Sequence, residues 1–150
     1  MKRFFTLTFC TLLALSCVNR NKYPLSSMNS TMNFHAGTQA ELDEGNQRIN
    51  AYKEELLQQG YRLVSTSTFH SSSSSNSDFN SSSNSRKQVI LDGQHGRLKQ
   101  VRITLLTSTS LVDEGPDLAA GVYAAISDEQ GMQEYNELYG KVVGIVTGRP

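Results

Sequence analysis

The side chains best suited to metal binding and acid–base chemistry are few in this chain of 150 residues. Its three histidines, His35, His70 and His95, are far apart, and none lies at a metal-ligand spacing from another. The short motifs of zinc proteases, serine hydrolases, P-loop nucleotide-binding proteins and dithiol oxidoreductases do not occur. Adjacent Glu54 and Glu55 would point apart on a helix, so they do not form an acid–base pair. The sequence therefore predicts no catalytic residue, no metal site and no cofactor.

The two cysteines carry the most distinctive chemistry in the sequence. Cys10 lies inside a run, Phe4 to Leu15, that contains no charged residue. Two cations precede this run and Ser16-Cys17 follows it, which is the order of a secretory signal peptide. A helix that spans a bilayer needs about 20 apolar residues, so the run predicts export and cleavage rather than a permanent span. Cleavage would leave Cys17 as the only thiol of the mature chain.

The segment Ala14-Leu15-Ser16-Cys17 resembles the lipobox of bacterial lipoproteins, in which a peptidase cuts before a cysteine that carries a diacylglyceryl group. The resemblance implies that residues 1–16 are a signal peptide and that Cys17 is the lipidation site. It further implies an exported protein that the lipid anchors to a membrane. Val18, rather than Asp, follows the cysteine, as in lipoproteins sorted to the outer membrane. The expected location is the outer membrane or the periplasmic face of a bacterial envelope.

Two other interpretations of the N-terminus are an unlipidated secreted protein and an uncleaved apolar anchor. Counting cysteines favours lipidation, because Cys17 would otherwise be a lone thiol in an oxidising compartment with no partner for a disulfide. Residues 17–30 are rich in Asn and Ser and have neither helical nor strand periodicity. They are therefore predicted to be a lipidated N-terminus followed by a flexible tether.

The clearest helix signal in the chain starts at a capping box, Thr38-Gln39-Ala40-Glu41. After the box, residues that could form one buried face recur at spacings of three and four, and Gly60 provides a stop. These positions are Leu42, Gly45, Ile49, Tyr52 and Leu56. The pattern predicts one amphipathic helix that packs against a sheet.

Three strands and a long loop are predicted after this helix. Residues 61–69 are rich in β-branched and aromatic types, which favours a strand. Residues 71–85 are almost all Ser and Asn, so they cannot bury enough apolar surface to fold and are predicted to be a disordered loop. Residues 88–92 and 98–108 are predicted to form an antiparallel hairpin.

The C-terminal part of the sequence suggests two short apolar strands, 121–126 and 141–147, with a helix between them that ends at Gly140. Such a connection is long enough for a parallel crossover. Tyr135 and Tyr139, four residues apart on that helix, are predicted to pack against the sheet; the alternative is an exposed pair that binds sugar or peptide.

These elements predict a single α+β domain over residues 31–150. Its sheet would be mixed but mostly antiparallel, with two helices on one face. Lys plus Arg (14) balance Asp plus Glu (14), so the total charge does not favour a nucleic-acid partner.

The interpretation of function that agrees with the missing catalytic motifs is a membrane-anchored, non-enzymatic binding or structural component of the envelope. Besides the membrane itself, its partner would be a protein or an envelope glycan. The alternative is a small envelope hydrolase that acts near the membrane. A hydrolase would need His70 or His95 to meet a carboxylate and a serine in one pocket.

Overall fold

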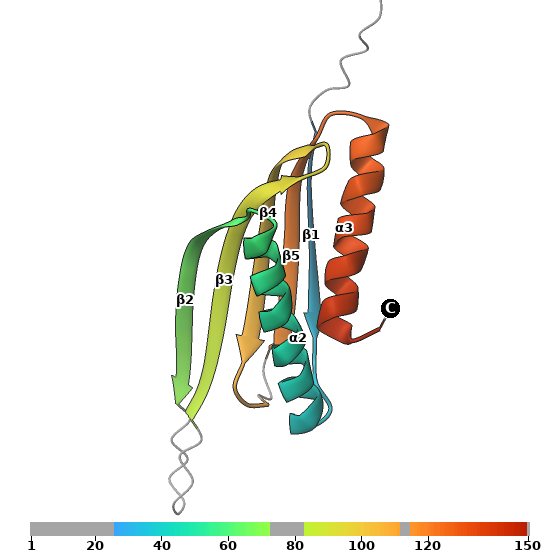
Figure 1. Ribbon diagram of the computed structural model, residues 1–150. Helices are drawn as coiled ribbons and strands as arrows, with labels where there is room; N and C mark the ends of the chain where they lie inside the picture. The colour runs from blue at the N-terminus through green and yellow to red at the C-terminus, as the bar shows by residue number, and fades with distance from the viewer. Residues whose placement is uncertain (1–25, 73–82, 112–114, 150) are drawn as a thin grey trace, which may run out of the picture.

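The computed structural model describes residues 26–72, 83–111 and 115–149. These ranges contain five strands and two helices, in the order β1 (Ser26–Phe34), α2 (Gln39–Gln58), β2 (Arg62–Ser72), β3 (Ser83–His95), β4 (Leu98–Ser108), β5 (Leu118–Ile126) and α3 (Glu129–Thr147). The strands form one sheet in the order β1-β5-β4-β3-β2, and each neighbouring pair is antiparallel. Both helices cover the same face of this sheet (Figure 1). The predicted α+β class, with one sheet and two helices on one face, is confirmed.

Helix α2 follows its sequence signals closely. The Thr38 hydroxyl accepts a hydrogen bond from the Glu41 amide at 3.2 Å, as a helix N-cap does. The Glu41 carboxylate accepts from the Gly37 amide at 2.7 Å, one residue before the cap. The helix ends next to Gly60, whose φ of 91° few residues other than glycine adopt. The five buried residues of α2 are the five that the spacing predicts, so this prediction is confirmed.

Strand β1 begins inside the segment that is predicted to be a tether. Its residues pair in register with β5, from Ser26 opposite Ile126 to Phe34 opposite Leu118. The tether prediction is therefore wrong for residues 26–30, which belong to the domain. Residues 17–25 lie outside the described ranges.

Helix α3 is longer than predicted, because the expected strand 141–147 is its last two turns. Gly140 does not end the helix; Val142 and Val146 are buried and continue the face that Leu138 belongs to. A β-branched run favours a strand by local propensity, but burial of its valines at helical spacing outweighs that preference. The helix ends at Gly148, where φ is 69°. Without the extra strand, the predicted parallel crossover is wrong, and every strand pair within the described ranges is antiparallel.

The two hairpins at β3 are both longer than the sequence suggests. Segment 71–85 is predicted to be a loop, but β2 continues to Ser72 and β3 starts opposite it at Ser83. The rest of that segment, residues 73–82, lies outside the described ranges. The hairpin of 88–92 with 98–108 is confirmed, although β3 continues to His95 and the turn is only Gly96-Arg97.

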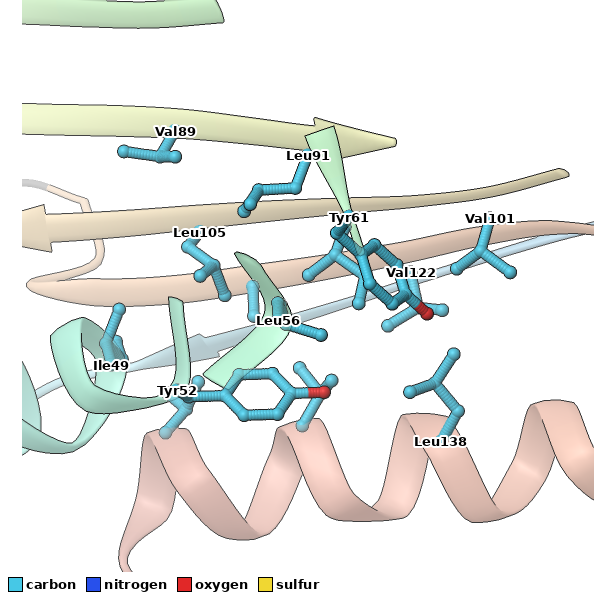
Figure 2. Close-up of a cluster of buried hydrophobic side chains, with 14 of the residues drawn as sticks. Ile49, Tyr52, Leu56, Tyr61, Val89, Leu91, Val101, Leu105, Val122 and Leu138 are labelled. Atoms are coloured by element: carbon cyan, nitrogen blue, oxygen red, sulfur yellow. The ribbon is translucent and has the colours of Figure 1, made fainter. Parts of the chain in front are cut away.

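One core lies between the helices and the sheet (Figure 2). Side chains from α2, α3 and the inner faces of β3, β4 and β5 meet there, among them Tyr52, Leu56, Leu91, Leu105 and Leu138, all at most 2% exposed. Each large side chain of this kind contributes about 1.5–3 kcal/mol when removed from water. Most of the large side chains on the helix-facing side of the sheet are therefore buried in this core.

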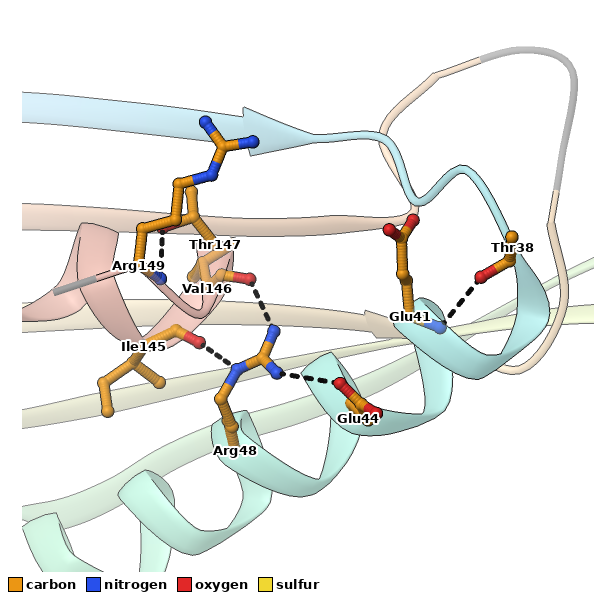
Figure 3. Close-up of polar contacts among 8 residues, drawn as sticks. All are labelled: Thr38, Glu41, Glu44, Arg48, Ile145, Val146, Thr147 and Arg149. Atoms are coloured by element: carbon orange, nitrogen blue, oxygen red, sulfur yellow. Dashed lines mark hydrogen bonds and ion pairs between the residues drawn. The ribbon is translucent and has the colours of Figure 1, made fainter.

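Arg48 of α2 joins the two helices at one end of the domain (Figure 3). Its Nε donates to the Ile145 carbonyl at 3.0 Å, and its Nη2 donates to the Val146 carbonyl at 3.4 Å. Carbonyls in the last turn of a helix have no partner within the helix, and a cation is favourable there. The guanidinium therefore stabilises the C-terminus of α3.

Candidate functional site

The candidate site lies on the sheet face opposite α2 and α3, here called the outer face. Successive strand residues point to opposite sides of a sheet. In β1 this places Met28 and Met32 against the core and leaves Asn29, Thr31 and Asn33 on the outer face. The sequence prediction missed these residues because it assigned residues 17–30 to a tether and included no strand before the first helix. The alternation of apolar and polar residues along β1 is the signal that could have revealed them.

Strand pairing brings polar side chains from β1, β5, β4 and β3 into rows across the outer face. Tyr123 of β5 lies opposite Asn29 on one side and Arg102 on the other. Arg102 in turn lies opposite Asp92 of β3. In the next row of the sheet, Gly121 of β5 lies between Thr31 and Thr104 and has no side chain of its own.

The outer face is hollowed around Gly121, in a depression of about 480 Å³ that we call the outer-face hollow. Small residues of β5 form its floor, and longer side chains of the neighbouring strands form its walls. It is lined by Asn29, Thr31, Asn33, Gln88, Arg102, Thr104, Leu106, Ala119, Ala120, Gly121 and Tyr123. A concave surface with a few convergent polar groups is the usual form of a ligand site.

An ion pair at one end of the outer-face hollow fixes the Arg102 side chain. Arg102 Nε donates to Asp92 Oδ1 at 2.7 Å and Nη2 donates to Oδ2 at 2.8 Å. Such two-pronged pairs hold both side chains in a defined geometry. The hydrogen bonds from Arg102, supplemented by the charge of Arg62, lower the pKa of Asp92 below its ordinary value of 3.8. Asp92 also raises the pKa of Arg102, so both groups stay ionised near neutral pH.

Two further hollows lie elsewhere on the described part of the molecule. One, of about 420 Å³, adjoins the outer-face hollow, shares Tyr123 and Arg102 with it and adds Lys99. The other, of about 300 Å³, lies on the helix side and is lined in part by Asn46 and Lys87. The Asn46 amide donates to the Ser108 carbonyl at 2.6 Å.

The histidines considered from the sequence are not brought together at any of these three hollows, none of which has a histidine in its lining. The exposed His35 has its Nδ1 3.9 Å from the buried Asp117 carboxylate. His70 lies opposite Ser85 on the exposed strand β2, and His95 ends β3. Within the described ranges, no three His, Cys, Asp or Glu side chains are grouped so that they could hold a metal ion.

The lipidation site predicted at Cys17 lies outside the described residues. No helix among the described residues is long and apolar enough to cross a membrane. Tyr135 and Tyr139 pack as the sequence predicts: their rings stack at 6.4 Å, and the buried Tyr135 hydroxyl donates to the Val122 carbonyl at 2.9 Å. They do not form an exposed platform for a ligand.

The fold and the outer-face hollow define a two-layer α+β domain with one open sheet face. Comparisons with protein-family models, with curated proteins and with solved structures find no match to the chain.

Proposed function

We propose that this chain is an exported lipoprotein, anchored to a bacterial membrane by lipid on Cys17, whose domain is a non-enzymatic binding module that uses its outer face. The observation that carries the proposal is the outer-face hollow of about 480 Å³, on the sheet face that neither of the two described helices covers. The hydrophobic core of the described residues lies on the other side of the sheet. The outer face is therefore not needed to form this core and can offer side chains to a partner.

The chemistry of the hollow agrees with binding rather than catalysis. Its polar lining consists of three amides, two threonine hydroxyls, the Tyr123 hydroxyl and Arg102, and this arginine is already paired with Asp92. General acid–base work needs a group that titrates near the working pH and is free to exchange a proton. Amide and alkyl hydroxyl side chains do not titrate in this range.

The start of β1 fixes how far the domain could lie from its anchor. Eight residues, 18–25, separate Cys17 from Ser26. A fully extended chain covers at most about 3.5 Å per residue, so the domain would stay within about 30 Å of the lipid-bearing cysteine. A ligand in the same envelope layer would therefore be within reach.

The anchor is tested by labelling cells that express the full chain or its Cys17→Ser variant with radioactive palmitate and then separating membrane from soluble fractions. We expect label and membrane association only with Cys17 present, because stable anchoring needs acyl chains that the variant cannot receive. Equal labelling and equal fractionation of the two forms would contradict the anchor.

The binding face is tested separately by placing a photo-crosslinking amino acid in the full chain in intact cells. We expect adducts with the crosslinker at Tyr123 of the outer face. A crosslinker at Asn136, which is exposed on α3, serves as the matched control. Adducts at Asn136 alone, or at neither position, would refute binding through the outer face.

A further inference from the structure

We infer that the outer-face hollow binds a neutral oligosaccharide of pyranose units. This inference rests on the proposed binding role of the outer face and names its ligand class. The hollow offers no net charge, a set of groups that both donate and accept hydrogen bonds, and an apolar floor beside an aromatic ring. Each of these three properties selects against a different competing ligand.

The charge balance of the outer-face hollow selects a neutral ligand. Arg102 is the only formally charged residue among the described residues of its lining. Its charge is compensated by Asp92, through two hydrogen bonds of 2.7 and 2.8 Å. A phosphate or carboxylate would need free cations, and a cation would need free carboxylates.

The amide and hydroxyl side chains match the hydroxyl groups of a sugar. Asn29, Asn33 and Gln88 each carry a donor and an acceptor on neighbouring atoms, and Thr31 and Thr104 each carry a hydroxyl that can do both. A sugar hydroxyl also donates and accepts. The oxygens of an anion only accept hydrogen bonds, so the amide oxygens of these side chains would find no donor on such a ligand.

The floor and one wall of the hollow suit the C–H faces of a pyranose ring. Gly121 and Ala119 of β5 give an apolar floor, and Leu106 of β4 adds an apolar part to the wall. Tyr123 is 38% exposed, so its ring is available at the rim. A tyrosine presents an apolar face together with a polar tip, which matches a sugar that has both C–H and O–H groups.

The position of the hollow in the sheet argues against an extended peptide. Peptides that bind to sheets usually add a strand at an edge, where backbone groups are unpaired. The hollow instead lies on the face of β1, β5, β4 and β3. Of these strands β5, β4 and β3 are paired on both sides, and the edge of β1 points along the plane of the sheet rather than into the hollow. Its width over three strand spacings is about 14 Å, so more than one sugar ring could fit.

The inference is tested with the full chain in a detergent that has no sugar headgroup. Three neutral tetrasaccharides, chitotetraose, cellotetraose and maltotetraose, are titrated separately while amide shifts are followed by NMR. Tetragalacturonic acid and tetra-alanine serve as the acidic and the peptide comparison. We expect at least one neutral sugar to bind with a Kd of about 1 mM or tighter, with shifts centred on Thr104, Gly121 and Tyr123.

A filling substitution at Gly121 distinguishes this site from any other. A Cβ at Gly121 would meet Thr31 Cγ2 at 3.4 Å and Thr104 Cβ at 3.8 Å, which are ordinary contacts, so the strand accepts a side chain. Gly121→Val would occupy the hollow and weaken sugar binding by more than about tenfold, while the protein stays folded. Ser65→Val makes a similar exchange on β2, beside Ile90 and outside the hollow, and should leave the Kd unchanged.

Removal of the Tyr123 ring tests the contact at the rim of the hollow and should also weaken binding. Tyr123→Ala should raise the Kd by about two- to tenfold, since aromatic contacts of this kind are modest. The inference would be overturned if none of the three neutral sugars changed the amide chemical shifts of the hollow. It would also be overturned if Gly121→Val bound these sugars as tightly as the parent does, or if only the acidic sugar or the peptide bound. A failure of this kind with crosslinked adducts still formed at Tyr123 would refute the glycan and retain the binding face.

Discussion

The ring of Tyr61 lies directly on the backbone of Gly93, and this contact makes a sharp prediction about stability. A Cβ added to Gly93 would lie 2.6 Å from Cγ and 2.8 Å from Cε1 of the Tyr61 ring. Carbon atoms in favourable contact are about 3.5–4.0 Å apart, so the ring or the strand would have to move by about 1 Å. Tyr61 is only 4% exposed and has core residues around it (Figure 2), so the ring has little room to retreat.

The Gly93→Ala substitution should therefore destabilise the domain. Overpacking of this kind costs about 1–3 kcal/mol. Replacing glycine also lowers the entropy of the unfolded chain, which returns about 0.4–1 kcal/mol. The expected net loss is about 1–2 kcal/mol of the free energy of unfolding, or roughly 3–8 °C in Tm.

A second glycine provides the matched control. Gly140 is exposed in α3, and a Cβ there would meet nothing within 4 Å. Gly140→Ala should therefore raise the free energy of unfolding by about 0.5–1 kcal/mol. Urea unfolding followed by circular dichroism measures both variants. If Gly93→Ala were as stable as the parent or more stable, the ring could not be seated on this strand as described.

A double variant separates the steric cause from other effects. In a Tyr61→Ala background, already weakened by the lost ring, adding Gly93→Ala should cost nothing further. The resulting coupling between the two positions should be about 1–3 kcal/mol. A coupling near zero would assign the loss to the backbone of β3 rather than to the ring.

Other predictions concern polar groups. Arg48→Met should lower the free energy of unfolding by about 1–2 kcal/mol in urea titrations, because two carbonyls of α3 lose their donor. Burial raises the pKa of Tyr61 from 10.0 to about 12, so its contribution to stability is complete below pH 10 and is lost as the pH rises toward 12. Between pH 10 and 12 the Tyr61→Phe variant should therefore lose less free energy of unfolding than the parent. Its hydroxyl has no hydrogen-bond partner in the described structure, so Tyr61→Phe should be no less stable at pH 7. Arg102 lowers the pKa of Asp92 below 3.8, so the stability from this pair is present above pH 3.8 and is lost as the pH falls below it. Asp92→Asn should therefore reduce the loss of unfolding free energy at acid pH. At pH 7 it should change the free energy of unfolding by less than about 1 kcal/mol, because the pair is partly exposed.

The sequence predicts α2 almost to the residue because every local signal there agrees with the tertiary structure. The Thr38 cap, the spaced apolar face and Gly60 mark its start, its buried side and its end, and each signal depends only on nearby residues. The end of α3 was not predictable in this way. Gly140 locally favours a helix end and the valines after it favour a strand, and only the core that buries Val142 and Val146 decides for a helix.

The candidate site was beyond sequence reasoning for a different reason. Its residues come from four strands, and their proximity depends on strand order and register rather than on spacing in the chain. Gly121 is one of eleven glycines in the sequence, and only its position between Thr31 and Thr104 makes it the floor of a hollow. The alternation in β1 could have placed Asn29 and Asn33 on one face, but not beside Tyr123.

The direction of β1 gives the anchored protein a defined orientation. The chain enters the sheet at Ser26, and β2 runs in the same direction as β1, so Ser72 and Ser83 lie at the opposite end of the sheet (Figure 1). The eleven residues of β2 extend over about 36 Å at 3.3 Å each. If lipid on Cys17 holds the Ser26 end near the bilayer, the ends of β2 and β3 at Ser72 and Ser83 would point away from the membrane. The outer-face hollow would then open sideways, parallel to the membrane, toward material that lies along its surface.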